Sequence, residues 1–337
     1  MATSKNALLQ FESGQSLTDY TAMTDSGDHT IFTSGSIWSG KSGYEPVVRP
    51  NGMVTGRNVL STHATNDTVT IAGFTAYSEG TLHTVTATTD TITRPSGDVA
   101  KINSITMDDA GAIAVIAGTD GATTTFSETR GAAGGPPYIP VDSVEIGQIR
   151  VTTQAAGVIA ASEIFQTVGT HTERFDYPIW DENNIGDGDA ATVAAKKNAY
   201  IEFASALDNP HTGDAYKKVY IRYYTPILAN IPKAFDFVPA ENTHSVTSTQ
   251  YYGGTSGAVS STLGQASFSM LMDDNITDSI VAEKDQILTF KHFADRNKTP
   301  YVLTQGTLGL SRSNPAGAQN QADATISAEV ASAEFAS

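Results

Sequence analysis

The chain has 337 residues, of which 39% are apolar, and this is enough to bury one large core or two smaller ones. Its 20 basic and 36 acidic side chains give a formal charge of −16. Conventional binding to nucleic acids depends on an excess of Lys and Arg, so this charge balance disfavours it. The absence of cysteine excludes disulfides, thiolate metal sites and cysteine nucleophiles.

Charged residues make up only 17% of the chain, below the roughly 25% of an average globular protein. Such a surface is expected where much of it is buried against neighbouring subunits, and a secreted, Thr-rich adhesin would have a similar composition. An acidic surface can still face DNA without binding it, because negative charge on the protein keeps the DNA phosphates hydrated and away from that surface. Composition therefore leaves both an assembling protein and an adhesin open.

The N-terminal segment has no readable secretion signal. Residues 1–14 contain one Lys and a short apolar patch at Leu8 and Leu9, without the longer apolar run of a signal peptide. The longest apolar stretch, residues 110–118, is far shorter than the roughly 20 residues that span a bilayer. We expect a soluble protein that is made in the cytoplasm and has no membrane partner.

Between residues 59 and 151, short β-branched segments alternate with turns rich in Gly, Asp and Pro. This pattern predicts a small β-sandwich. A bend or linker is expected at residues 131–137 (GAAGGPP), because prolines and glycines suit neither a helix interior nor a central strand. The expected strands are 69–71, 83–87, 91–93, 102–107, 113–116 and 144–151.

One helix is expected at residues 189–207. Asp189 can cap its start, Asn209-Pro210 can end it, and apolar side chains recur on one face at Val193, Tyr200, Ala204 and Leu207. A long, polar, glycine-rich loop is expected within residues 226–262, and such loops are often functional. Strands are expected at 217–225, 267–272, 301–310 and 324–330, whereas 280–293 fits either a helix or a strand.

Residues 35–42 (GSIWSGKS) match the P-loop pattern G-x-x-x-x-G-K-[ST]. A P-loop needs a helix that starts at its Lys, so that the N-terminal amides can hold phosphate. One glycine and two prolines follow Lys41 by residue 50 and disfavour that helix. A Walker B-like stretch at 268–273 is interrupted by a serine, and no α/β alternation surrounds it. We therefore interpret residues 35–42 as a β-turn region.

The acidic loop Asp181–Asp189 resembles an EF-hand loop in its Asp, Asn and Gly content. Its fifth position is Ile185 and its twelfth is Thr192, so the bidentate Glu of a Ca²⁺ site is missing. We favour an acidic loop that leads into a helix N-terminus, where the dipole stabilises carboxylates. Whether this loop binds a cation is left open.

Motifs of other enzyme classes are absent from the sequence. No His is followed by Glu, and no G-x-S-x-G nucleophile elbow occurs. Adjacent carboxylates at Asp108-Asp109 and Asp273-Asp274 would suit a glycosidase, but the sequence does not show which acids meet in the fold. We predict no catalytic, cofactor-binding or metal-binding residues, and we expect that the protein is not an enzyme.

Tyrosines are concentrated in two places. The first group is Tyr216, Tyr220, Tyr223 and Tyr224, and the second is Tyr251-Tyr252. Tyrosine is amphipathic and frequent at contacts, so these groups indicate a subunit interface or a carbohydrate platform. The alternative is a sheet face that packs on the helix, and for Tyr220 and Tyr224 interface and core are equally favoured.

The general plan of the chain resembles the major tail proteins, or tail tube proteins, of long-tailed, non-contractile bacteriophages. Three features carry the resemblance. They are the start at Met1–Leu9, a single helix within a β core, and an inserted β domain that leads into residues 127–148 (SETRGAAGGPPYIPVDSVEIGQ). The resemblance covers most of the chain, and it supplies no catalytic, cofactor or metal residue.

The resemblance implies a mainly β fold with a tail-tube-like β-sandwich or barrel core and one flanking α-helix. Residues 1–57 and 152–337 would form this core, with the helix at 189–207. Residues 58–151 would form an inserted, β-sandwich-like domain on the outer surface. Edge strands would close a ring of subunits, and the loop 240–262 and both chain ends would contact the next ring.

Members of this family form hexameric rings that stack into the tail tube of the virion, and genome DNA passes through an often acidic lumen. The implied partners are further copies of the chain, other tail proteins, and DNA in transient, non-specific passage. The implied location is the virion tail, after synthesis in the host cytoplasm. The main alternative is a virion decoration protein or an adhesin that binds cell-surface glycans; a glycosidase, a P-loop NTPase and a capsid protein are further alternatives.

Overall fold

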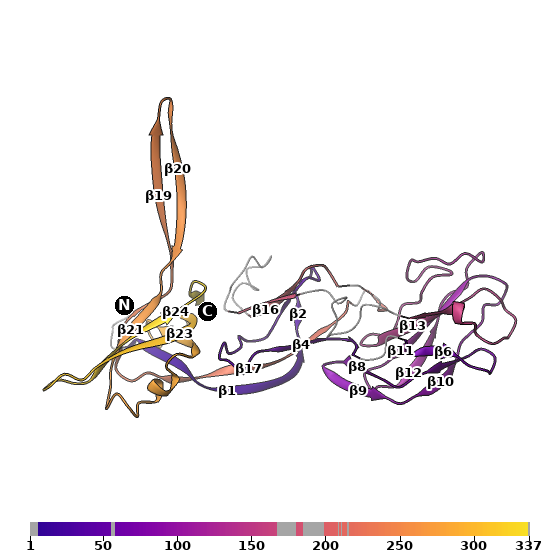
Figure 1. The fold of residues 1–337 in the computed structure, drawn as a ribbon, viewed down its shortest axis with the longest axis horizontal. Helices are drawn as coiled ribbons and strands as arrows, with labels where there is room; N and C mark the ends of the chain where they lie inside the picture. Colours follow the sequence, from indigo (N-terminus) through magenta and orange to yellow (C-terminus); the bar gives the residue numbers. More distant parts are fainter. Residues whose placement is uncertain are drawn as a thin grey trace.

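The computed structural model describes residues 6–54, 58–166, 180–184, 199–207, 209, 211–213 and 216–335. This part of the chain is mainly β, and its helices are two short 3₁₀ turns, η2 (Ala161–Glu163) and η4 (Ser279–Glu283). Figure 1 shows an elongated molecule with a lobe at each end and a narrower middle part. We call the end that holds both chain termini the terminal lobe, and the opposite end, built from residues 52–54 and 58–166, the distal lobe. None of the described helices is long and apolar enough to cross a bilayer.

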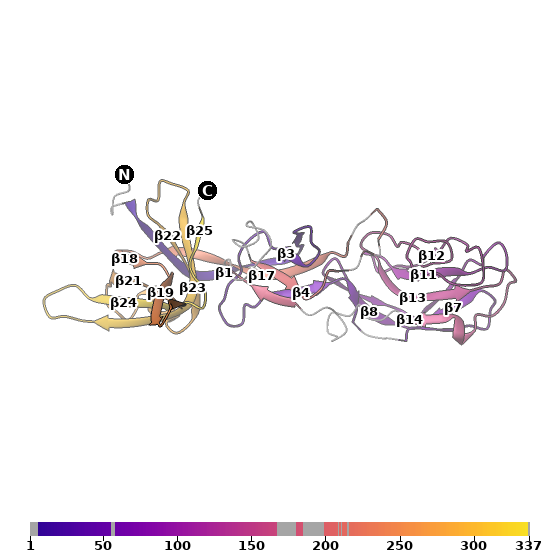
Figure 2. The ribbon, with the colours of Figure 1, turned by 90° about the horizontal axis from the view of Figure 1, so that it is seen from above.

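One antiparallel sheet connects the terminal lobe with the middle part. Its two long strands, β1 (Leu8–Ala22) and β17 (Val219–Asn230), pair with each other, and Figures 1 and 2 show them running from one part into the other. The pairing shifts register after Glu12 and again after Thr18, as at β-bulges, which bend a strand. Across the sheet the order is β18 (Ala234–Val238), β21 (Ala266–Leu271), β24 (Gln321–Ser327), β23 (Tyr301–Ser313), β22 (Ile287–Phe293), β1, β17 and β4 (Val47–Pro50), and β25 (Ala333–Phe335) pairs with β23.

Buried and outward residues alternate strictly along β21 and β24, and the buried side chains contribute to the core of the terminal lobe. In β21 the apolar residues Ala266, Phe268 and Met270 are buried, whereas Ser267 and Ser269 point to the other face. The buried side chains pack against a cluster that includes the aromatic rings of β1 and β22. Burial of each large apolar side chain contributes about 1.5–3 kcal/mol, so this face fixes the register of the sheet.

The middle part adds a second sheet, with the order β15 (Trp180–Asn183), β16 (Tyr200–Phe203), β3 (Ile31–Thr33) and β2 (Thr24–Asp25). Its core is aromatic. The rings of Phe32 and Phe203 meet edge to face at 5.6 Å, and those of Trp38 and Tyr223 at 6.5 Å. The side chains of Trp38 and Tyr223 connect this sheet with β17.

The prediction of a helix at residues 189–207 is wrong where the structure describes it. Residues 200–203 form β16, which pairs with β15 and β3, and residues 189–198 lie outside the described part. Tyr200, Ile201 and Phe203 are all buried, because both faces of this strand are covered. A strand that is buried on both faces lacks polar alternation, and its apolar run can coincide with helical spacing.

The distal lobe consists of three small antiparallel sheets around one core, which gathers side chains from Met53 to Ile164. Five of the six strands predicted between residues 59 and 151 are confirmed, whereas the strand predicted at 91–93 shares only Thr91 with an observed strand. Glu79 and Gly80 both have positive φ, at 50° and 73°, as a tight two-residue hairpin turn requires. The sheets are β10 (Thr88–Thr91), β7 (Thr68–Ile71) and β6 (Leu60–Thr62); β12 (Ile113–Ala117), β11 (Lys101–Met107), β13 (Val144–Val151) and β14 (Ile164–Gln166); and β5 (Gly52–Met53), β8 (Phe74–Ser78) and β9 (Thr81–Val85).

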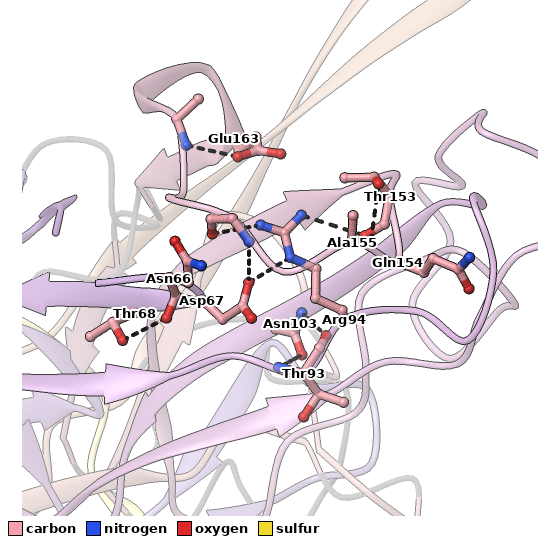
Figure 3. A network of polar contacts seen from close by, with 12 residues as sticks. Asn66, Asp67, Thr68, Thr93, Arg94, Asn103, Thr153, Gln154, Ala155 and Glu163 are labelled. Carbon is pink, nitrogen blue, oxygen red and sulfur yellow. Dashed lines mark hydrogen bonds and ion pairs between the residues drawn. The ribbon is translucent and has the colours of Figure 1, made fainter. Parts of the chain in front are cut away.

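A buried arginine fastens the irregular segment that follows β13 to the distal lobe (Figure 3). Arg94 donates through Nε to Oδ1 of Asp67 at 2.7 Å and through Nη2 to the carbonyl of Gly157 at 3.0 Å. The same Oδ1 accepts the backbone N–H of Gly157 at 3.2 Å. The Arg94 side chain is only 10% exposed, so solvent screens this ion pair little. The boundaries of the inserted domain at residues 57 and 152 remain a prediction.

Candidate assembly surface

A free β-hairpin projects from the terminal lobe. Strands β19 (Asn242–Tyr251) and β20 (Gly254–Leu263) pair from Asn242 opposite Leu263 to Tyr251 opposite Gly254. Figure 1 shows the hairpin standing away from the sheets and projecting to one side of the elongated molecule. Every residue of both strands is exposed except Leu263, which is half-buried. The hairpin therefore buries neither of its faces in the monomer.

The prediction of a loop at residues 240–262 is wrong, because this segment is a regular hairpin. The turn is made by Tyr252 and Gly253, and Gly253 has a φ of 99° that suits glycine. The hairpin was not recognisable by periodicity, because Ser and Thr occupy both faces. The sequence did contain one signal of a hairpin: Val246 and Val259 are equally far along the chain from the turn, and they pair directly in the structure.

The hairpin carries no charged side chain. No Asp, Glu, Lys or Arg occurs between Glu241 and Asp273, although the chain as a whole has a charge of −16. Small hydroxyls dominate, and the hydroxyls of Ser245 and Ser260 bond across the strands at 2.6 Å. Its one apolar cross-strand pair, Val246 and Val259, is 71% and 70% exposed.

These properties predict a partner for the hairpin. A single two-stranded hairpin is marginally stable in water, and the outer edges of β19 and β20 offer unpaired backbone groups. Proteins usually protect such edges with charged side chains, prolines or bulges, and this hairpin has none of these. An uncharged strand pair with two open edges suits contact with another β-structure, through backbone pairing or through its valine face.

A second exposed surface of the terminal lobe is lined by small hydroxyls. It is the outer face of β21, β24 and residues 307–313 of β23. Asp323 provides its one ionisable side chain and accepts the hydroxyl of Ser269 at 2.7 Å. The one cation of the three strands, Arg312, pairs with the buried Ala322 and donates to the carbonyl of Asn275 on the opposite face, so the outer face offers no cation to a phosphate. The other outward residues are Ser267, Leu271, Thr307, Gly309, Ser311, Ser313, Gln321, Thr325 and Ser327.

The P-loop-like segment 35–42 forms bends, and no helix follows its Lys. The amine of Lys41 pairs with Glu283 at 2.6 Å. A Cβ at Gly40 would lie 2.8 Å from the side chains of Gln305 and Ile287, so the bend is packed against the sheet. This segment joins the terminal lobe to the middle part, and it has no cradle of helix amides for a phosphate.

The adjacent carboxylates stabilise turns. Asp108 accepts the backbone N–H groups of Ala110 and Ala112 at 3.0 and 2.7 Å. The hydroxyl of Thr277 and nearby backbone N–H groups lower the pKa of Asp274 to about 2. Among the described residues no cluster of three or more potential ligands could hold a metal. Of the EF-hand-like loop, only Asp181–Asn184 are described, and residues 181–183 belong to β15.

The two groups of tyrosines have different environments. Tyr220 and Tyr223 are buried, at 6% and 4% exposure, and Tyr224 packs edge to face on Tyr44 at 5.0 Å. Tyr251 and Tyr252 stand at the tip of the hairpin, at 62% and 108% exposure. Tyr216 stacks on His29 at 3.3 Å, so the second group is the more exposed and the better placed for contact with a partner.

Comparisons of the chain with protein-family models, with curated proteins and with solved structures give no significant match. Support for a function therefore comes from the hairpin and from the exposed faces of the terminal lobe.

Proposed function

We propose that this chain is a structural virion protein whose copies form stacked rings, which build the tail tube of a long-tailed, non-contractile phage. The single observation that carries the proposal is the hairpin β19–β20, which is exposed on both faces, free of charge and open at both edges. Such an element gains stability when a neighbour covers it, and a neighbouring copy is present wherever the protein is concentrated. The described part of the chain offers no cluster of metal ligands as a rival site.

The hydroxyl-lined face of β21, β24 and β23 suits the wall of a DNA conduit. Its one ionisable group, Asp323, is acidic, and small hydroxyls cannot form ion pairs with phosphates. Repetition of this face around a ring would give a smooth lumen with one carboxylate per copy, which repels DNA weakly and does not retain it. In this arrangement the charge of −16 keeps the whole particle from adhering to its own cargo.

The proposal is tested by placing charge on the hairpin. In the double variant Val246→Lys/Val259→Lys, like charges lie opposite each other and the apolar contact is lost. We expect the wild-type protein to sediment as assemblies much larger than 35.5 kDa and the variant to sediment as a monomer. The matched control is Leu82→Lys/Val158→Lys, which charges two residues of similar type in the distal lobe, at 49% and 52% exposure. A wild-type protein that stays monomeric at every concentration would overturn the proposal.

A further inference from the structure

The tip of the hairpin presents two adjacent aromatic side chains to solvent. Tyr252 is fully exposed, and a Cβ on Gly254 would lie 2.9 Å from the Tyr251 hydroxyl, so the Tyr251 ring lies over this glycine. Tyrosine combines a large apolar area with one polar end, and it is enriched among the residues that dominate protein interfaces. The tip thus has the composition of an interface anchor without a partner in its own chain.

The terminal lobe contains a groove with complementary chemistry. A hollow of about 500 Å³ lies between β18, the start of β1 and the end of β22. Its aromatic lining includes Phe235, which is 40% exposed, and Phe237, whose ring stacks on His292 at 4.5 Å. Lys233, Asp236 and Arg296 also line the groove, so two cations and one carboxylate stand at its walls.

This combination suits a tyrosine more than an aliphatic side chain. Aromatic walls accept another ring in stacked or edge-to-face contact, and cations favour the face of a tyrosine ring. The Lys233 amine is half exposed and lies 3.4 Å from Asp273, a surface pair that contributes little and leaves the amine able to turn toward a ring. The volume of the groove lies in the range of sites that enclose small ligands, which is ample for a side chain.

The hairpin tip of one copy can reach the groove only in another copy. Ten paired residues at roughly 3.3 Å each give the hairpin a length of about 30 Å. Figure 1 shows it straight and pointing away from the sheet that contains β21 and β24. A straight hairpin cannot return its tip to the lobe from which it starts, so contact in trans is the available geometry.

We propose that the tip Tyr251-Tyr252 of one copy inserts into the groove between β18, β1 and β22 of a second copy. This inference rests on the proposed self-assembly and names the contact that joins two copies. The lobe surface beside Phe235 and Phe237 is the receptor, and the tyrosine rings are the inserted groups.

The absence of cysteine allows a direct test by cross-linking. Tyr252→Cys and Phe235→Cys are made in separate proteins, which are mixed, allowed to assemble and treated with a short bismaleimide. We expect a linked dimer whose junction peptide contains positions 252 and 235, at several times the yield obtained with Tyr252→Cys and Leu82→Cys. Leu82 is the matched control, because it is 49% exposed and lies in the distal lobe.

Assemblies that form normally but give the 252–235 product no more often than the 252–82 product would overturn the docking site and leave self-assembly intact. If sedimentation of the wild-type protein shows no assembly, both proposals fail.

A second measurement does not depend on introduced thiols. Tyr251→Ser/Tyr252→Ser is expected to weaken association by about 30-fold or more, the effect of losing an interface hot spot, and Tyr252→Phe is expected to keep most of the affinity. Both variants change exposed side chains, and circular dichroism should show the same β content as for the wild type. Equal association of the Ser variant and the wild type would contradict the insertion of the tip.

Discussion

The hydroxyl of Ser39 donates a 2.5 Å hydrogen bond to the carboxylate of Glu12, which is completely buried. The amide of Gln15 and the backbone N–H of Thr289 donate to the same carboxylate at 2.8 and 3.1 Å. Glu12 lies where the pairing of β1 with β17 shifts register. It therefore connects β1, the P-loop-like bend and β22 at the junction of the terminal lobe and the middle part.

We expect Glu12→Ala to lower the free energy of unfolding by about 2–4 kcal/mol, because it leaves buried donors without an acceptor. Urea unfolding followed by tryptophan fluorescence measures the change, since both tryptophans, Trp38 and Trp180, lie outside the distal lobe. Asp19→Ala, on the same strand, is the control: its carboxylate is 80% exposed in a pair with Arg222, and such pairs contribute about 0–1 kcal/mol. Equal losses for the two variants would contradict a junction held by Glu12.

Arg94→Ala should release the segment that follows β13. The guanidinium serves Asp67 and Gly157 at once, so we expect a loss of about 2–3 kcal/mol and faster hydrogen exchange around residue 157. Arg94→Lys should recover little, because an ammonium cannot reproduce the planar fork. Arg222→Ala serves as the control, since Arg222 is 3.7 Å from a mostly exposed Asp19. Unchanged exchange around residue 157 in Arg94→Ala would argue against this role.

Alkaline pH should destabilise the contact between β17 and the distal lobe. Burial, together with the nearby carboxylates of Asp142 and Glu79, raises the pKa of Tyr220 well above its usual value near 10. The unfolded chain therefore loses this proton at lower pH than the folded chain, and stability falls as pH rises above about 10. Tyr220→Phe should lose the hydrogen bond to Glu79, at a cost of about 1 kcal/mol near neutral pH, and flatten this alkaline decline. Unfolding midpoints measured across this pH range provide the check, and parallel curves for the two proteins would contradict the assignment.

The hydroxyl-lined face should respond to a reversal of its single charge. In assembled protein, Asp323→Lys replaces one carboxylate per copy by one ammonium per copy. We expect binding to duplex DNA to increase by about tenfold or more at low salt and to weaken as salt rises. Co-sedimentation of DNA with the assemblies measures this. Asp19→Lys, on an 80% exposed side chain of β1, should have a smaller effect if Asp323 faces the lumen. An equal response of the two variants would contradict that placement.

The sequence predicts strands best where one face is buried and the other is polar. Residues 267–272 and 324–330 show this, because buried and outward residues alternate in β21 and β24. The prediction from sequence fails at Tyr200–Phe203, where burial on both faces of the strand removes the polar half of the alternating pattern. A stretch of apolar residues with no polar alternation fits a buried strand and a helix equally well.

The sequence indicated where the candidate assembly surface lies, but it did not indicate that the segment forms a β-hairpin. The glycine-rich stretch that follows Glu241 indicated a functional segment, but Ser and Thr on both faces hid the strands. The groove beside Phe235 left no signal, because β1, β18 and β22 are far apart in the sequence and meet only through the sheet order. Such a site depends on long-range pairing, which local patterns do not encode.

Negative-stain electron microscopy of the purified wild-type protein tests the central claim most directly. We predict rings and hollow tubes of uniform diameter, with a regular repeat along the tube. Fields of single elongated particles at every protein concentration, with no ring and no tube, would contradict the account.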